Sequence, residues 1–334
     1  MIPSPQGPRV VHGDCLEIMK MLPDCSVDSI VTDPPYGLGF MGKAWDALPP
    51  GEEWAAECLR VLKPGGHLLA FGGSRTWHRL AVAVEDAGFE IRDSIAWLYG
   101  SGFPKHRAAL KPAFEPVVLA RKPFKGSLAA NEAEHGTGAL SIDACRIAGA
   151  IPVVPQPVYG VKADGVTGFG SGQGRNGEMS RAEGRWPANV VLDDTTADML
   201  DQQSGMSPAK AGRTGKRGGS AWHGMESFGS PEKVGTWPAD LGGGASRFFY
   251  VAKAPKRERP VVDEVAHPTV KPLALMRWLV RLVTPEGGTV LDPFAGSGTT
   301  VEACILENLH CIAIEREAEY LPLIQARINR QEAA

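Results

Sequence analysis

The residues best suited to chemistry follow a short apolar strand near the N-terminus. Asp33, Pro34, Pro35 and Tyr36 form this run, directly after the strand expected over Val27–Thr32. The prolines fix φ and have no backbone N–H, so the run offers a carboxylate and carbonyl oxygens as hydrogen-bond acceptors. Asp33 and the Pro34 carbonyl can each accept one N–H of a planar amine, and Tyr36 can stack on the ring that carries it. These residue types predict a site for the exocyclic amine of a nucleobase.

A second candidate site lies near the C-terminus, in a strand, a glycine turn and the start of a helix. The strand expected over Thr289–Asp292 leads into the segment Pro293, Phe294, Ala295, Gly296, Ser297 and Gly298. Glycines there let the backbone approach a ligand, and Glu315 ends the next strand about 20 residues later, where an acid can bind ribose hydroxyls. The segment lacks the full Gly-x-Gly-x-x-Gly pattern of dehydrogenases. We therefore predict a nucleoside ligand and disfavour a dehydrogenase.

Two further segments have residues suited to a cofactor. Asp14 follows a strand expected over Arg9–His12. At that position it either faces a cofactor or caps the helix after it, and the sequence leaves both alternatives open. The run His267–Pro272 precedes a helix expected over Leu273–Val283. Free amides at this helix start, together with Lys271, predict a site for a carboxylate group.

Alternating strands and helices position these residues. Strands are expected at Arg9–His12, Val27–Thr32, His67–Phe71, Phe89–Leu98, Glu115–Ala120, Arg247–Ala252, Thr289–Asp292 and His310–Ile314, and helices at Leu16–Leu22, Trp54–Leu62, Trp77–Ala87, Leu273–Val283 and Thr300–Leu306. Both candidate sites follow buried strands, so they meet only if the strand ending at Thr32 lies beside the strand ending at Asp292. The expected fold class is α/β, a circularly permuted Rossmann-like sheet with an inserted region.

The middle of the chain differs in composition from both ends. From about residue 126 to 245, glycine and polar residues replace the regular alternation, which indicates an inserted region between two halves at 1–125 and 246–334. Cations that could meet DNA phosphates lie in this insert and in a glycine-rich loop before it: Lys105, Arg107, Lys210, Arg213, Lys216 and Arg217. A solvated loop is the alternative for each group. The glycine-rich segment Gly37–Asp46 could form a lid.

Composition bounds the class of protein. A chain of 334 residues with 43% hydrophobic residues is long enough for one large domain with an insertion. The net charge of −3 neither requires nor excludes a nucleic-acid partner. The six cysteines form no Cys-x-x-Cys pair, so we expect no metal site or disulfide framework. No signal peptide and no apolar run near about 18 residues is present, which predicts a soluble cytoplasmic protein without a membrane partner.

The two sites and their order in the chain resemble one enzyme family. Asp33–Tyr36, Gly13–Leu16, His267–Pro272, Asp292–Gly298 and Glu315 together are similar to the motifs of the β class of S-adenosylmethionine-dependent DNA amino-methyltransferases. The resemblance covers both ends of the chain and leaves the insert unexplained. It implies S-adenosyl-L-methionine as the cofactor and double-stranded DNA as the substrate.

The resemblance also implies a role for each matched residue. Asp33, Pro34, Pro35 and Tyr36 are the catalytic run, Asp292 and the loop Phe294–Gly298 hold the methionine moiety, Glu315 the ribose and Asp14 the adenine amine, and Thr269 and Lys271 lie beside the methionine carboxylate. The target base is flipped out of the duplex, and Tyr36 replaces its lost stacking. The insert would read the DNA sequence.

Several alternatives stay open from the sequence. By resemblance, Asp33 favours the 6-amino group of adenine, which predicts a site-specific adenine methyltransferase, with the 4-amino group of cytosine as the alternative. A protein glutamine methyltransferase is a further alternative, because an amide also offers a planar amine. A non-catalytic DNA-binding protein would leave Asp33 and Glu315 without use. A homodimer and a cognate restriction endonuclease are partner hypotheses.

Overall fold

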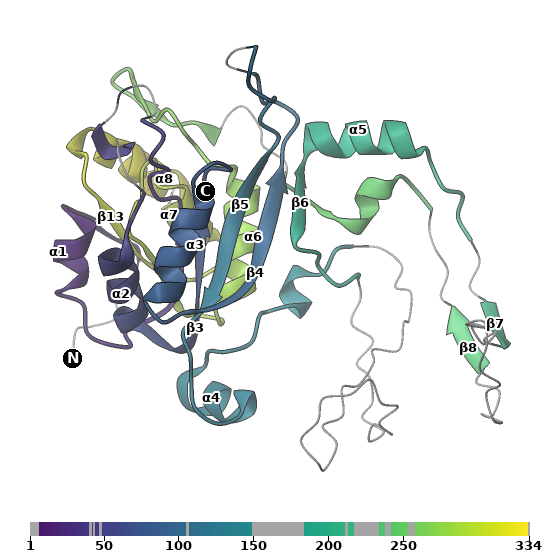
Figure 1. The fold of residues 1–334 in the computed structure, drawn as a ribbon, viewed down its shortest axis with the longest axis horizontal. Helices are drawn as coiled ribbons and strands as arrows, with labels where there is room; N and C mark the ends of the chain where they lie inside the picture. The colour runs from purple at the N-terminus through teal and green to yellow at the C-terminus, as the bar shows by residue number, and fades with distance from the viewer. Residues whose placement is uncertain are drawn as a thin grey trace.

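A nine-stranded mixed sheet forms the centre of the protein (Figure 1). The computed structural model describes residues 7–39, 42, 44–46, 49–104, 107–148, 184–210, 213–216, 234–237, 242–252 and 258–332. The strands lie in the order β1, β13, β12, β2, β3, β5, β4, β6 and β9. Their bounds are β1 Arg9–His12, β2 Val27–Thr32, β3 Leu62–Phe71, β4 Glu90–Leu98, β5 Phe114–Arg121, β6 Val190–Asp193, β9 Tyr250–Ala252, β12 Thr289–Asp292 and β13 His310–Glu315.

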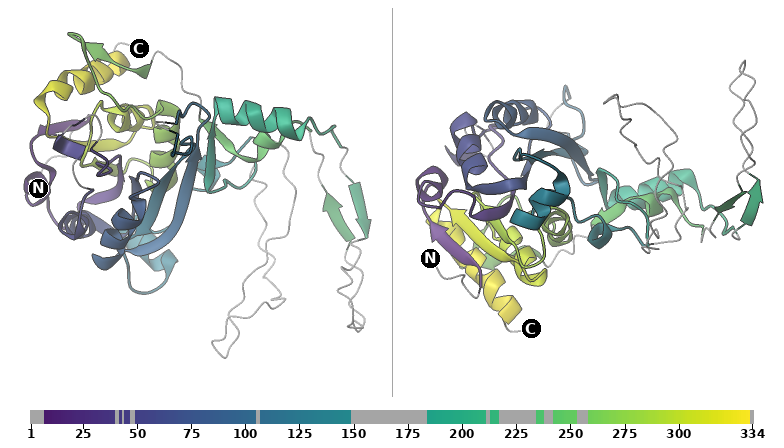
Figure 2. Two further views of the ribbon diagram at one scale, coloured as in Figure 1. Left: turned by 45° about the horizontal axis from the view of Figure 1, so that its top comes forward. Right: turned by 90° about the horizontal axis from the view of Figure 1, so that it is seen from below.

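Helices cover both faces of the sheet (Figure 2). One face packs against α1 Cys15–Met19, α2 Glu52–Val61 and α3 Trp77–Asp86, and the other against α6 Leu273–Val283, α7 Thr299–Leu306 and α8 Leu321–Glu332. Ile30 lies in the core on the side of α1, α2 and α3, and Val31 lies in the core on the side of α6, α7 and α8, because successive side chains of a strand point to opposite faces. β2 is therefore buried along its whole length. Its one charged side chain, Asp28, is paired with Lys63 at 2.6 Å.

The two predicted sites meet where β2 and β12 lie side by side. These strands are parallel neighbours, with Ile30 opposite Leu291. The hydroxyl of Thr32 donates a hydrogen bond of 2.6 Å to Oδ1 of Asp292, so the ends of the two strands are joined directly. The strand order diverges at this junction, toward β13 and β1 on one side and toward β3 on the other. The adjacency that the sequence required for a single site is confirmed.

Element boundaries differ from the sequence prediction in a few places. β3 begins at Leu62, five residues before the predicted His67, because the Lys63–Gly66 segment continues the strand through a bulge opposite β2. Gly65 has φ +80° and lies against Asn131, in α4 Leu128–His135. A side chain at Gly65 would collide with Asn131. The predicted strand over 247–252 is instead a turn of 3-10 helix, Ala245–Phe248, followed by β9.

The middle of the chain is partly integrated into the sheet. β6 pairs in parallel with β4, and β9 pairs in parallel with β6. From there α5 Asp194–Ser204 leads away from the sheet toward a small antiparallel pair, β7 Arg213–Lys216 and β8 Val234–Trp237 (Figure 1). Among its described residues the predicted insert thus supplies one strand, β6, to the central sheet, and its boundaries stay a prediction. Among the described residues no helix is long and apolar enough to cross a membrane.

Candidate functional site

A cavity of about 1050 Å³ opens at the carboxyl ends of β2, β12 and β13. Predicted site residues in its walls are Asp14, Asp33, Pro34, Pro35, Tyr36, Thr269, Lys271, Asp292, Phe294, Ala295, Gly296, Ser297 and Glu315. Gly298 stands just behind this wall as the N-cap of α7. Pockets for one small ligand commonly span about 300–1,000 Å³. The cavity is therefore large enough for a nucleoside cofactor together with a second planar group.

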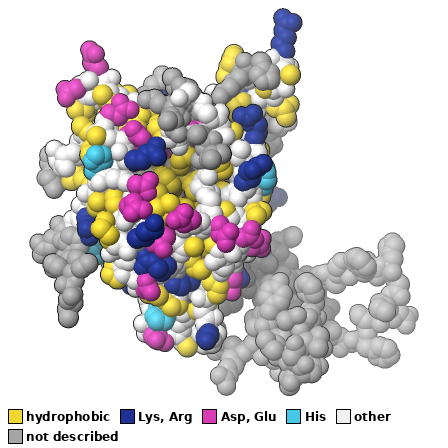
Figure 3. Space-filling model, turned by 60° about the vertical axis from the view of Figure 1, so that its left-hand side comes forward, with side chains coloured by type: hydrophobic (Ala, Val, Ile, Leu, Met, Phe, Trp, Pro, Cys, Tyr) yellow, Lys and Arg dark blue, Asp and Glu magenta, His cyan; other side chains and the backbone are white. Residues whose placement is uncertain are grey.

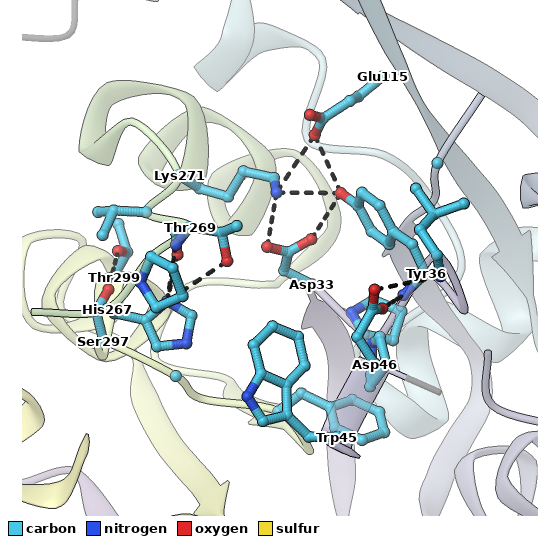
Figure 4. Close-up of a pocket in the computed structure, with 18 of the residues that line it drawn as sticks. Asp33, Tyr36, Trp45, Asp46, Glu115, His267, Thr269, Lys271, Ser297 and Thr299 are labelled. Carbon is cyan, nitrogen blue, oxygen red and sulfur yellow. Dashed lines mark hydrogen bonds and ion pairs between the residues drawn. The ribbon is translucent and has the colours of Figure 1, made fainter. Parts of the chain in front are cut away.

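Asp33 lies at the centre of a partly buried network of charged and polar groups (Figure 4). Its Oδ2 accepts a hydrogen bond of 2.6 Å from the ammonium of Lys271, and its Oδ1 accepts one of 2.8 Å from the Tyr36 hydroxyl. A second carboxylate, Glu115 at the start of β5, lies 3.3 Å from the same ammonium and 3.0 Å from the same hydroxyl. Burial, then the charges of Asp33 and Glu115, raise the pKa of Tyr36, so the phenol stays protonated.

The loop that carries Asp33 is held by Asp46, in the 3-10 helix Ala44–Asp46. Its buried carboxylate accepts three backbone N–H groups, from Tyr36 at 2.6 Å, Gly37 at 3.0 Å and Leu38 at 3.2 Å. Thr76 completes the frame by donating to the carbonyl of Tyr36 at 2.7 Å. Among the described residues the carbonyl of Pro34 accepts no hydrogen bond. The loop therefore presents one carboxylate and one carbonyl as acceptors on a fixed backbone.

The glycine turn after β12 approaches the opposite side of the cavity. Gly296 and Gly298 have φ of +53° and +78°. A Cβ at Gly296 would lie 3.1 Å from the ring of His267. The Glu315 carboxylate accepts the amides of Gly296 and Glu317, both at 2.7 Å, which fixes the acid beside the turn. Burial raises the pKa of Glu315, and these two hydrogen bonds oppose that rise.

Asp14 and Asp292 each organise a loop at the cavity edge. Oδ1 of Asp14 accepts the amides of Leu16 at 2.9 Å and Glu17 at 3.4 Å, so the helix-cap alternative is confirmed while the side chain also borders the cavity. Asp292 is 1% exposed and accepts the amide of Phe294 at 3.1 Å in addition to the Thr32 hydroxyl. Burial raises its pKa to about 6 despite these hydrogen bonds. Direct contact of either carboxylate with a ligand stays a prediction.

The segment before α6 is arranged differently from the carboxylate site that the sequence predicted. The Lys271 ammonium points to Asp33 and Glu115 (Figure 4). The first free amide of the helix, that of Leu273, already donates at 2.8 Å to the carboxylate of Glu258. Burial acts to lower the pKa of Lys271, but the charges of Asp33 and Glu115 outweigh it and raise the pKa. The helix start and Lys271 are therefore both engaged by carboxylates of the protein itself.

Three aromatic side chains line the cavity beside the glycine turn. The rings of Trp45 and His267 are stacked, with centroids 6.1 Å apart, and Tyr320 meets His267 edge-on at 4.5 Å. The ring Nδ1 of His267 contacts the carbonyl oxygen of Thr269 and shapes the turn that leads to Lys271. Trp45 belongs to the segment predicted as a lid, and its ring lies on the cavity wall in this structure. Movement of that segment stays a prediction.

Comparison with known proteins identifies the family. A model of the N6/N4 methyltransferase family, described as DNA methylase, matches residues 27–326. The chain belongs to this DNA methylase family. Among curated proteins it is 24% identical over 331 residues to the Type II methyltransferase M.HpaI of Haemophilus parainfluenzae, covering 97% of this chain and 74% of that protein. It is likewise 24% identical over 342 residues to the DNA adenine methyltransferase YhdJ of Escherichia coli (strain K12), covering 97% and 83%.

One solved structure supports the fold, and a second matches at a lower TM-score. PvuII DNA methyltransferase, which is cytosine-N4-specific, has a TM-score of 0.51 at 16% identity over 97% of this chain and 87% of that one. The crystal structure of the M1.HpyAVI–SAM complex has a TM-score of 0.47 at 20% identity, with coverage of 96% and 99%. The likeness to the PvuII enzyme supports a mixed α/β fold around a large central sheet.

Of the predicted DNA-contacting cations, the two with described side chains do not line the cavity. Arg107 and Lys210 are exposed. Arg213 and Lys216 belong to β7, of which only the backbone is described. Lys105 and Arg217 lie outside the described residues. Phosphate contacts by these six cations stay a prediction.

Three site residues of the methylase were given no role by the sequence reasoning. Glu115 was predicted only as the start of a strand, Asp46 only as the end of a lid, and Glu258 not at all. Glu115 comes directly before Pro116 at a strand start, and Asp46 follows Trp45 after a glycine-rich loop. Such positions mark loops that need an acceptor, but a sequence does not say which amides or cations an acid will meet.

Proposed function

We propose that this DNA methylase transfers a methyl group from S-adenosyl-L-methionine to the 6-amino group of adenine in double-stranded DNA. One observation carries the proposal: the amine acceptors of the Asp33 loop and the glycine turn near Glu315 line the same cavity. The Thr32–Asp292 hydrogen bond joins the strands from which both loops start. A cofactor at the turn and an amine at Asp33 would therefore face each other.

The residues at the glycine turn fit this cofactor. Gly296 leaves room for a ligand against the backbone, and the Glu315 carboxylate, fixed by two amides, has lone pairs left for ribose hydroxyls. We assign Asp292, Phe294, Ala295, Ser297 and Gly298 to the methionine side. Thr269 and Asp14 border the remaining walls. When bound, the cofactor supplies an electrophilic methyl group on a sulfonium centre.

The protein's own residues orient the amine. A nucleobase amine is a weak nucleophile because its lone pair is delocalised into the ring. Asp33 and the Pro34 carbonyl would each accept one N–H, which turns the lone pair toward the methyl group for in-line displacement. Pro35 keeps the loop rigid, and the Tyr36 ring would stack on the base. The Lys271 and Tyr36 contacts hold the Asp33 carboxylate in place before the base arrives.

The DNA must deliver its base into the cavity from outside. A stacked base cannot reach Asp33, so the base is flipped out of the duplex. The loop between β4 and β5 borders the cavity and carries two exposed apolar side chains, Phe103 at 83% and Leu110 at 93% exposure. Arg107 and Lys111 on the same loop are exposed and suited to phosphates. This loop therefore forms the proposed DNA-facing rim.

Sequence recognition is assigned to residues 126–245 between the two halves of the catalytic domain. On the face drawn in Figure 3 the described Lys and Arg side chains are interspersed with Asp and Glu, so the described part of that face has no broad cationic surface. Affinity would then come from local cations, including those of the β7–β8 region. The name of M.HpaI supports a restriction setting, and we propose a cognate endonuclease and a cytoplasmic location.

Adenine is proposed over cytosine for two reasons. The relative YhdJ is named a DNA adenine methyltransferase, and the acceptor at the first catalytic position is Asp33. Cytosine-N4 methylation is the alternative, because the PvuII enzyme shares the fold. Digestion of methylated DNA to nucleosides followed by mass spectrometry decides between them. A peak of 6-methyladenine is expected, and 4-methylcytosine alone would overturn the assignment.

The roles of the two half-sites are separable by mutation. Asp33→Ala is expected to keep cofactor binding while methylation falls by about three powers of ten, since the amine loses its charged acceptor. Glu315→Ala is expected to weaken cofactor binding instead. The matched control is Asp86→Ala, an exposed acid at the end of α3. Near-normal turnover of Asp33→Ala, measured by single-turnover methylation, would contradict the proposed mechanism.

A further inference from the structure

The cluster around Asp33 has more negative than positive charge. Asp33, Glu115 and Lys271 come from the end of β2, the start of β5 and the segment before α6. Their side chains are 23%, 21% and 9% exposed, and Lys271 Nζ lies 2.6 Å from Asp33 and 3.3 Å from Glu115. Two carboxylates thus share one ammonium. With the Tyr36 phenol protonated, the cluster has a formal charge of −1.

This balance matters for the acceptor strength of Asp33. A carboxylate paired one-to-one with an ammonium at 2.6 Å has much of its charge neutralised in a poorly solvated site. Methyl transfer also makes the amine nitrogen develop positive charge, which a nearby uncompensated ammonium would oppose. Glu115 draws on the same ammonium and restores one negative charge to the cluster. The electrostatic environment then favours the cationic product of the amine.

Glu115 also fixes the geometry of Tyr36. The phenol has one proton and accepts from Lys271 at 3.1 Å, so it donates either to Asp33 at 2.8 Å or to Glu115 at 3.0 Å. The phenol therefore has an acceptor whichever way its proton points. When an arriving amine competes for Asp33, the phenol can donate to Glu115 without leaving its position. The Tyr36 ring stays oriented while Asp33 is released to the substrate.

We infer that Glu115 is a positioning residue for methyl transfer, which shares Lys271 and Tyr36 with Asp33 and so leaves the Asp33 carboxylate available to accept the amine. The inference rests on the proposed function, since it needs Asp33 as the amine acceptor. Glu115 itself need not touch the base. Its effect therefore belongs to the rate of transfer rather than to the binding of cofactor or DNA.

The test replaces Glu115 with Gln, which keeps the shape and removes the charge. Glu115→Gln is expected to lower the single-turnover rate by about tenfold or more, with dissociation constants for S-adenosyl-L-methionine and DNA changed by less than about twofold. The matched control is Glu90→Gln, which removes a carboxylate paired with Arg121 at 2.6 Å on the same pair of strands. The control is expected to keep the wild-type rate. A Glu115→Gln rate within about twofold of wild type would overturn the inference.

A double variant separates charge balance from simple structural support. In a Lys271→Met background there is no ammonium to compensate, so adding Glu115→Gln is expected to change the remaining rate by less than about twofold. If the rate reductions of Glu115→Gln and Lys271→Met multiply in the double variant, a role of Glu115 through Lys271 is contradicted. If Lys271→Met has no measurable activity, the single-variant comparison with Glu90→Gln decides.

Failure of this inference is distinguishable from failure of the proposed function. An Asp33→Ala enzyme that still turns over contradicts the proposed function itself. An inactive Asp33→Ala enzyme together with an unimpaired Glu115→Gln enzyme contradicts only the role of Glu115. Thermal melts of all variants in the cofactor-bound state identify any loss that is due to unfolding.

Discussion

Asp46 offers a direct test of how the Asp33 loop is positioned. Its carboxylate accepts the amides of Tyr36, Gly37 and Leu38, and its side chain is 2% exposed. Asp46→Ala leaves all three donors without this partner. Asp46→Asn keeps an oxygen for the two amides now at Oδ1 but sets an N–H₂ group against the amide of Leu38. The two variants therefore weaken the loop to different degrees.

The magnitude follows from the hydrogen bonds. A bond to a charged acceptor contributes about 1.5–3 kcal/mol, and water will replace part of this where the loop is half-exposed. With about 1 kcal/mol lost for each of the three amides, Asp46→Ala weakens the ordered loop by about 3 kcal/mol, or about two powers of ten in its population. For Asp46→Asn one lost bond and one donor–donor contact predict about 1.5 kcal/mol, or about tenfold.

Single-turnover methylation with saturating DNA measures this effect, and calorimetry measures cofactor binding. Both variants are expected to methylate more slowly than wild type, and Asp46→Ala more slowly than Asp46→Asn. Cofactor affinity is expected to change less, because the glycine turn is untouched. The Asp86→Ala enzyme serves again as the surface control. If Asp46→Ala had a lower melting temperature yet methylated DNA at the wild-type rate, other contacts would position the Asp33 loop and the role given to Asp46 would be refuted.

Three other perturbations follow from the structure. Because burial raises the pKa of Asp292 to about 6, its stabilising contribution is complete below about pH 4 and is lost as the pH rises through 6. At pH 8 the free energy of unfolding of Asp292→Asn is therefore expected to exceed that of wild type by up to about 3 kcal/mol, and at pH 4 the difference is expected to vanish. Equal differences in melting temperature at both pH values would contradict this. Phe103→Ala, which removes an exposed ring at the cavity rim, is expected to slow methylation of a paired target about tenfold but to spare a mismatched one. Replacing Lys210, Arg213, Lys216 and Arg217 together with Glu is expected to weaken DNA binding. The slope of log affinity against log salt concentration is expected to become shallower by up to about 0.9 for each lost phosphate contact. Unchanged binding across a salt series would assign these cations to a solvated loop.

Much of the architecture was predictable because its signals are local. The bounds of β2, α6 and β12 match the prediction residue for residue, since an apolar run, a helical periodicity and a proline or glycine boundary all lie within a short window. The acceptor character of Asp33 and the turn at Gly296 follow from residue type for the same reason. The adjacency of β2 and β12 was also inferable, because two half-sites on parallel strands can meet at only one place in a sheet.

The partners of the charged side chains were decided by the tertiary structure alone. Lys271 was expected at a cofactor carboxylate, yet it reaches Asp33 and Glu115, which are 238 and 156 residues away in the chain. Glu258 caps α6, and Asp46 caps the Asp33 loop, although neither has a sequence pattern that names its donors. An ion pair depends on distances of a few ångströms between segments that only folding brings together. Residue types therefore determined what chemistry this methylase can do, and the packing of β2, β5 and the segment before α6 determined which groups do it together.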